Sequence, residues 1–214
     1  MIDTTMAVLM RARRLLWVGL LLCPVILTAA DRARDLQLRD VRGGVVKPFG
    51  GGTQASVAFF VATDCPVSNA YAPEIQRVCR EYSARGVTCS LIYEDIDSMP
   101  HSSKLLQQVR GHLDDFKYSA MPAAVDEDRA AAGVAKASIT PTAVVVDRRG
   151  DIRYRGRIDN LYAALGKTRQ QITSHDLRDA LDAVLAGRPV PHPDTEPIGC
   201  FITDPALLRT HSHE

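Results

Sequence analysis

The chain has 214 residues, of which 46% are hydrophobic and 24% are charged, a composition typical of one globular domain. Its formal net charge is +1 and only 6% of its residues are aromatic. This balance argues against the basic, aromatic-bearing surface that binds nucleic acid, so we expect no nucleic-acid partner.

The first thirty residues have the pattern of a secretory signal peptide. Three arginines within residues 11–14 precede the apolar run Leu15–Leu27, and small residues follow at 28–30. The run is shorter than the roughly 20 residues that span a membrane. We therefore expect cleavage after Ala30 or Ala33, export to the periplasm or the outside, and no stable membrane insertion. A retained N-terminal anchor is the alternative.

Removal of this leader changes the charge balance. It takes away three of the 26 basic residues and one of the 25 acidic residues, which leaves 23 basic and 24 acidic side chains. The mature protein would be almost neutral, which argues against electrostatic binding to a membrane surface.

Hydrophobic patterns in the exported part predict alternating strands and helices. Gly43-Gly44 divides two short β-like pieces of Asp35–Phe49, as in a hairpin. We expect strands at Val57–Val61, Val87–Tyr93, Ala123–Val125, Thr142–Val146 and Asp151–Ile158, and helices from Pro66 to Tyr82, over Ser102–Phe116 and Arg129–Ala137, and from a Ser174 cap to Leu185. This alternation predicts a sheet of the parallel type with helices on both faces. One domain would span residues 31–190, and the proline-rich segment 191–214 would be an extended surface tail.

Cys65 lies where the first of these buried strands gives way to a helix. Pro66 suits the first helical position, so Cys65 falls at or beside the N-cap. The unpaired N–H groups and the positive end of the helix dipole favour a thiolate there, and such thiols have pKa values of about 3.5 to 7.5. Ser68, in the first turn, can donate a hydrogen bond to that thiolate. The position predicts a reactive sulfur.

These elements, with the motifs FFVATDCPVSN (59–69) and ITPTAVVVDRRGDIRYRG (139–156), resemble the redoxin branch of the thioredoxin-like superfamily. That branch contains the alkyl hydroperoxide reductase and thiol-specific antioxidant proteins and exported thioredoxin-like proteins. The resemblance covers about residues 36–187. It implies an α/β thioredoxin-like fold, in which a central mixed sheet has helices on both faces and a strand-helix insertion precedes a cis-proline motif. It also implies that Thr140-Pro141 is this motif, with Pro141 facing Cys65 and shaping the substrate groove.

The chain departs from two patterns within that superfamily. Thioredoxin would have a second cysteine where Ser68 stands, so exchange between adjacent thiols is impossible here. A peroxiredoxin would have a proline at Ala58 and a threonine or serine at Ala62. We therefore expect a thiol-disulfide oxidoreductase with weak peroxidase activity at most, acting on protein or small-molecule thiols and disulfides without a cofactor.

Four cysteines remain in the exported part, and Cys200 is the internal candidate to resolve an oxidised Cys65. It lies in the proline-rich tail, in TEPIGCFI, where Gly199 gives the backbone freedom to approach. Resolving cysteines on C-terminal tails also occur among the redoxins that the chain resembles. Cys79 and Cys89 fall on an apolar helix face and in a buried strand, so we expect both to be core thiols held apart from Cys65.

Two other classes of function remain open. Copper chaperones of the same fold use two cysteines and a distant histidine. Here Cys65, Cys200 and His112 could supply such ligands. By itself, His112 is expected to be a solvated helix residue. A non-catalytic binding module would instead hold an extended peptide by backbone hydrogen bonds in the groove beside Pro141.

Overall fold

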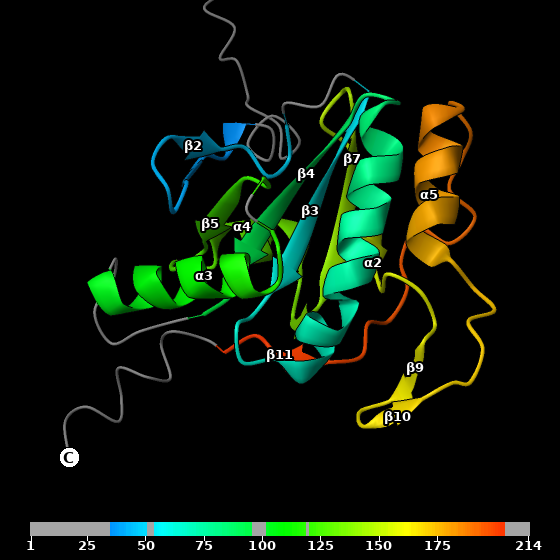
Figure 1. The fold of residues 1–214 in the computed structure, drawn as a ribbon. Coiled ribbons are helices and arrows are strands. Elements are labelled where there is room, and N and C mark those ends of the chain that lie inside the picture. Colours follow the sequence, from blue (N-terminus) through cyan, green and yellow to red (C-terminus); the bar gives the residue numbers. More distant parts are fainter. Residues whose placement is uncertain (1–34, 51–53, 96–101, 119, 204–214) are drawn as a thin grey trace, which may run out of the picture.

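The computed structural model of the chain describes residues 35–50, 54–95, 102–118 and 120–203 (Figure 1). The predicted signal peptide and its cleavage sites lie outside these ranges. Within them, no helix is both long and apolar enough to cross a membrane.

A five-stranded mixed sheet forms the centre of the fold. Its order is β5 (Ala123–Val125), β4 (Val87–Tyr93), β3 (Ala55–Val61), β7 (Thr142–Asp147) and β8 (Ile152–Gly156). The first three strands are mutually parallel, whereas β7 is antiparallel to both β3 and β8. Every residue of β3 is buried, because this strand is central and covered on both faces. The mixed sheet and thioredoxin-like architecture that the resemblance implied are confirmed, whereas the sheet of the parallel type predicted from the alternation is wrong for β7 and β8.

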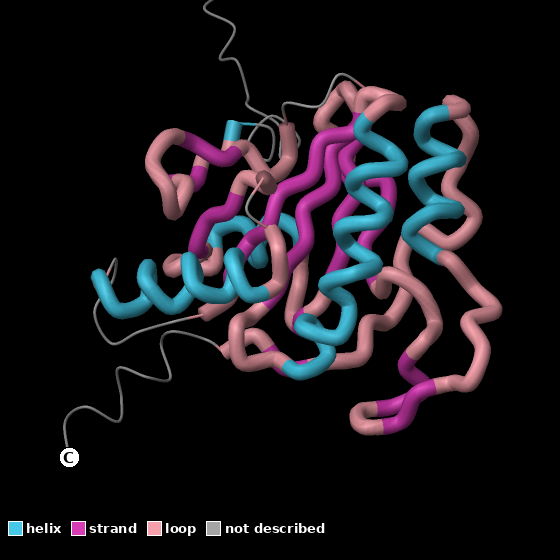
Figure 2. The backbone as a smooth tube through the Cα atoms, viewed as in Figure 1, coloured by secondary structure: helices cyan, strands magenta, loops and turns pink. Residues whose placement is uncertain are grey.

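Helices cover both faces of the sheet, as Figures 1 and 2 show. Phe59 of β3 belongs to a core shared with α2 (Pro66–Ser83), α3 (Ser103–Asp115) and α5 (Asp176–Leu185). Phe60, the next residue, points to the other face, because side chains alternate along a strand. There it packs with α4 (Ala130–Ala135) and with the hairpin of β1 (Leu38–Arg39) and β2 (Val45–Val46).

Two helix boundaries differ from the prediction. The N-cap of α5 is His175, which makes no side-chain capping bond, so Ser174 was wrongly predicted as the cap. Helix α4 ends at Ala135 because Lys136 adopts a left-handed conformation that cannot continue a helix. A further hairpin, β9 (Tyr162–Ala164) with β10 (Lys167–Thr168), follows β8 and was not predicted.

The C-terminal tail is docked on the domain at two places. The N–H of Thr195 donates to the carbonyl of Arg155 in β8 (3.0 Å). The hydroxyl of Thr195 is hydrogen-bonded to the hydroxyl of Tyr154 in the same strand (2.7 Å). Farther along, β11 (Cys200–Phe201) pairs antiparallel with β6 (Ile139–Thr140). The described part of the tail, residues 191–203, is extended, and its residues 200–201 form part of the fold.

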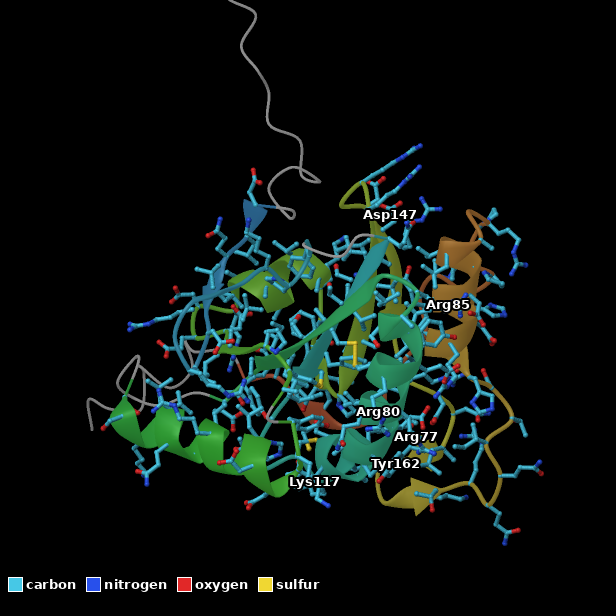
Figure 3. All side chains as sticks on the ribbon, turned by 45° about the horizontal axis from the view of Figure 1, so that its top comes forward. Arg77, Arg80, Arg85, Lys117, Asp147 and Tyr162 are labelled. Carbon is cyan, nitrogen blue, oxygen red and sulfur yellow. A yellow bond between two sulfur atoms is a disulfide. The ribbon has the colours of Figure 1, made fainter. Side chains whose placement is uncertain are left out.

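Cys79 and Cys89 form a disulfide, so the prediction of two core thiols is wrong. Cys79 lies on α2 and Cys89 on β4, with Cα atoms 6.0 Å apart, within the usual range for a disulfide. Helix α2 crosses back over the sheet between two parallel strands, which brings its last turns beside the start of β4. Figure 3 shows this bond in yellow between the helix and the sheet. The two free cysteines of the described residues are Cys65 and Cys200.

Candidate active site

Cys65 caps the N-terminus of α2. Its backbone is extended (φ −83°, ψ 108°), Pro66 follows in the first turn, and its Sγ accepts a hydrogen bond from the backbone N–H of Ser68 at 3.4 Å. The side chain is completely buried. This is the helix-start position that the sequence predicted, and it directs backbone donors at the sulfur.

The short strand β6 and the proline that follows it face Cys65. The Thr140–Pro141 peptide bond is cis, as the resemblance implied. The Sγ of Cys65 lies 3.3 Å from the carbonyl oxygen of Thr140 and donates to it as a thiol. Pro141 lies beside a small hollow whose other walls include Tyr71 and Ile198. Residues far apart in the sequence therefore enclose one sulfur.

Cys200 lies in the strand that covers this site. In the β11–β6 ladder it is paired with Thr140, whose carbonyl oxygen lies 3.3 Å from Cys65 Sγ, and the thiols of Cys65 and Cys200 interact. Gly199 packs directly on the cis-proline loop: a Cβ at this position would lie 1.8 Å from the carbonyl oxygen of Thr140. The docked tail and its glycine thus bring together the two free cysteines, which are 135 positions apart in the printed sequence.

The two thiols have opposite pKa shifts. Burial alone would raise the pKa of Cys65, but hydrogen bonds with the side chains of Cys200, Ser68 and Thr140 and with the backbone of Ser68 outweigh burial and lower it. Burial, with the hydrogen bond and charge of Cys65, raises the pKa of Cys200 to about 12. The Ser68 hydroxyl is buried in the first turn of α2 and has no oxygen or nitrogen partner among the described residues. These opposite shifts make Cys65 the more acidic of the two thiols.

We expect a pH titration of the reduced protein to separate these two thiols. Thiolate absorbance in the ultraviolet should show one cysteine that remains ionised below the ordinary thiol pKa, and the step should vanish in Cys65→Ser. Ser68→Ala removes a donor to the thiolate and should move the step to higher pH. Ser83→Ala, at the exposed far end of α2, should leave it in place. Titration of Cys65 at or above the pKa of a free thiol would contradict the helix-start argument.

A buried polar network, which the sequence did not reveal, fixes the loop in front of Cys65. Asp95 accepts hydrogen bonds from the backbone N–H of Thr63 (3.1 Å) and from its hydroxyl. The Asn69 side-chain amide donates to the carbonyl of Thr63 (3.1 Å), and its Oδ1 accepts a hydrogen bond from His112 Nε2 (2.8 Å). Asp95 is the second residue after β4, whose carboxyl end lies at the same sheet edge as Cys65. A polar residue at that position was the available signal in the sequence.

The structure corrects the reading of His112 and of the copper alternative. His112 is buried, not solvated, and its second ring nitrogen is 2.8 Å from the Tyr93 hydroxyl. Both ring nitrogens therefore have protein partners. Among the described residues, no three histidine, cysteine or acidic side chains converge as metal ligands, so Cys65, Cys200 and His112 do not form the expected set.

The comparisons with known proteins agree with this architecture. The AhpC/TSA family model matches residues 29–155, more than half of the chain. None of the curated proteins matches significantly.

Two solved structures are similar over most of their length. An uncharacterized conserved protein from Geobacillus kaustophilus is 27% identical, with a TM-score of 0.67 and coverage of 79% of this chain and 89% of that one. A hypothetical protein from Sinorhizobium meliloti 1021 is 26% identical, with a TM-score of 0.66 and coverage of 79% and 91%. A more distant match, MTB dsbF, is 14% identical, with a TM-score of 0.50 and coverage of 74% and 98%, and indicates a common fold alone.

Proposed function

Since the chain belongs to the AhpC/TSA family and is a thiol oxidoreductase of thioredoxin-like fold, we propose that it works through an internal cysteine pair, with Cys65 as nucleophile and Cys200 as resolving cysteine. One observation carries the proposal. The strand that bears Cys200 is hydrogen-bonded to the strand that precedes the cis-proline, and the interaction between the thiols of Cys65 and Cys200 supports their pairing.

The first step is attack of the Cys65 thiolate on a substrate disulfide. A bond forms between Cys65 and one substrate sulfur, the substrate S–S bond breaks, and the other substrate sulfur leaves as a thiolate that takes a proton from solvent. The helix N-terminus, Ser68 and the side chain of Thr140 hold the thiolate form of Cys65. Pro66 sets the start of the helix, and Pro141 forms a wall of the site.

The second step is attack of Cys200 on the mixed disulfide. Cys200 gives up its proton, bonds to the sulfur of Cys65 and displaces the substrate thiol, so that the substrate gains two electrons and the cysteine pair loses two. The negative charge of Cys65 is one cause of the raised pKa of Cys200. This charge disappears when Cys65 enters the mixed disulfide, so formation of the first bond makes Cys200 easier to ionise. An external dithiol would restore the pair by the reverse steps.

Peroxide is an unfavourable substrate for this site. Ala62, at the position of the expected hydroxyl, has no polar side chain, and the hydroxyl of the neighbouring Thr63 is bound by Asp95. Cys65 is also completely buried beneath the tail. These observations support thiol-disulfide exchange over efficient peroxide reduction.

The disulfide between Cys79 and Cys89 supports the proposed export. Disulfides form and persist mainly in oxidising compartments such as the periplasm and the extracellular space. Export through the predicted signal peptide would place the protein there, with protein or small-molecule disulfides as substrates.

The binding-module alternative has less support. A peptide held beside Pro141 would need the edge of β6, and residues 200–201 of the tail already pair with that edge. The same contact that supports the cysteine pair therefore occupies the groove that a module would use.

Glutathione disulfide tests the proposed function. The reduced wild-type protein should release glutathione and form an internal disulfide, whereas Cys200→Ser should retain one glutathione on Cys65, detectable by intact-protein mass. Cys65→Ser, the matched control, should retain none and should fold normally. Release of glutathione by Cys200→Ser at the wild-type rate would remove Cys200 from the mechanism.

A further inference from the structure

Arg129 connects the Cys200 strand to the carboxyl end of β4. Its Nε donates to the carbonyl of Thr203, three residues after Cys200, at 3.0 Å. Its Nη1 is 2.7 Å from Oε2 of Glu94 and 3.0 Å from the carbonyl of Asp126, and its Nη2 is 2.9 Å from the carbonyl of Glu94. One guanidinium thus bonds three segments of the chain.

Glu94 fixes the orientation of this guanidinium. Its side chain is 1% exposed and that of Arg129 is 11% exposed, so the pair is shielded from solvent. Burial, with the nearby charge of Asp126, raises the pKa of Glu94 to about 9, and Arg129 opposes that rise. Since the Glu94 carboxylate and carbonyl hold Nη1 and Nη2, the remaining donor, Nε, is aimed at the tail. A cation that served only to neutralise Glu94 would not need a hydrogen bond to Thr203.

The Cys200 strand needs such anchors. Strand β11 has only two residues, and two-residue pairing is too short to hold a segment by itself. Beyond it, Ile202 donates its N–H to the carbonyl of Ser138 (2.9 Å) and packs against the core on the α4 face. Arg129, the residue before α4, holds the next carbonyl. Thr195 anchors the tail on the other side of Cys200.

We propose that Arg129 is a positioning residue for the internal step, which holds Cys200 against Cys65 by binding the carbonyl of Thr203 in the tail. This inference rests on the proposed function. Because Cys65 is completely buried under the tail, the same contact also sets how often an external thiol reaches Cys65 in place of Cys200.

Arg129→Lys separates positioning from charge balance. Lysine keeps a cation beside Glu94, but its single ammonium cannot reproduce the fork that bonds Glu94 and Thr203 together. We expect the equilibrium between the internal disulfide and the glutathione mixed disulfide to shift roughly tenfold toward the mixed disulfide, the effect of losing one charge-assisted hydrogen bond. Hydrogen exchange at the amide of Ile202 should accelerate. Arg110→Lys is the matched control, because Arg110 also binds a backbone carbonyl, that of Val41, remote in sequence from the tail.

The outcomes distinguish this inference from the proposed function. Wild-type equilibrium and wild-type exchange at Ile202 in Arg129→Lys would overturn the positioning role and leave the cysteine pair intact. Failure of the wild-type protein to form the internal disulfide would overturn the proposed function instead. If Arg129→Lys does not fold, the double variant Glu94→Gln/Arg129→Met removes the buried charges together and should show the same shift; a wild-type equilibrium there would again overturn the role.

Discussion

Gly199→Ala should almost abolish the internal disulfide while leaving the domain folded. A Cβ at residue 199 would lie 1.8 Å from the carbonyl oxygen of Thr140, far inside van der Waals contact. That oxygen belongs to the backbone of the cis-proline loop, which cannot move aside as a flexible side chain can. Overpacking costs up to about 3 kcal/mol, so we expect closure between Cys65 and Cys200 to fall about 100-fold. The ratio of internal to glutathione mixed disulfide measures the change.

Two further measurements make this test specific. Alkylation of Cys65 should become faster in Gly199→Ala, because the strand that buries the sulfur no longer docks. Gly111→Ala, in α3, is the matched control, since a Cβ there would meet no atom within 4 Å. Closure at the wild-type level in Gly199→Ala would show that the docked tail is not needed to bring the thiols together.

Ser68→Cys should transfer the internal partner of Cys65 from the tail to the helix. Residues three positions apart in a helix have side chains about 5–6 Å apart at Cβ, and the backbone N–H of residue 68 already lies 3.4 Å from the Cys65 sulfur. In the Cys200→Ser background, the new thiol should restore the glutathione release that Cys200→Ser alone has lost. Intact-protein mass after treatment with glutathione disulfide gives the readout.

The control for this rescue is a thiol elsewhere on the same helix. Ser83→Cys in the Cys200→Ser background adds an exposed cysteine at the far end of α2 and should leave glutathione bound to Cys65. Persistence of the mixed disulfide in Ser68→Cys/Cys200→Ser would mean that the first turn of α2 does not present residue 68 to Cys65.

The central elements could be predicted because their signals are local. An unbroken apolar run predicted β3, and Pro66 after Cys65 predicted the start of α2 and the acidic position of the thiol. The cis bond at Pro141 was inferred from the family resemblance, since local residue preferences seldom predict it.

The remainder depends on tertiary proximity. The bond between Cys79 and Cys89 was missed because each cysteine was assessed within its own element, and only the crossing of α2 over β4 brings them together. The contacts of the docked tail include a close backbone approach at Gly199 and a carbonyl bonded by Arg129. Backbone contacts of this kind leave no periodic hydrophobic pattern in the sequence, so they could not be predicted from it. Burial of His112 was missed for the same reason, because its partners come from β4 and α2.

Peptide mapping of the fully oxidised wild-type protein tests the central claim most directly. The purified protein would be oxidised with a mild disulfide-forming reagent, digested without reduction and analysed by mass spectrometry. The described geometry predicts two linked peptide pairs, Cys79 with Cys89 and Cys65 with Cys200. The first pair serves as an internal control for the digestion. Recovery of that pair together with Cys200 as a free thiol, and Cys65 over-oxidised or bonded to an external thiol, would contradict the internal cysteine pair.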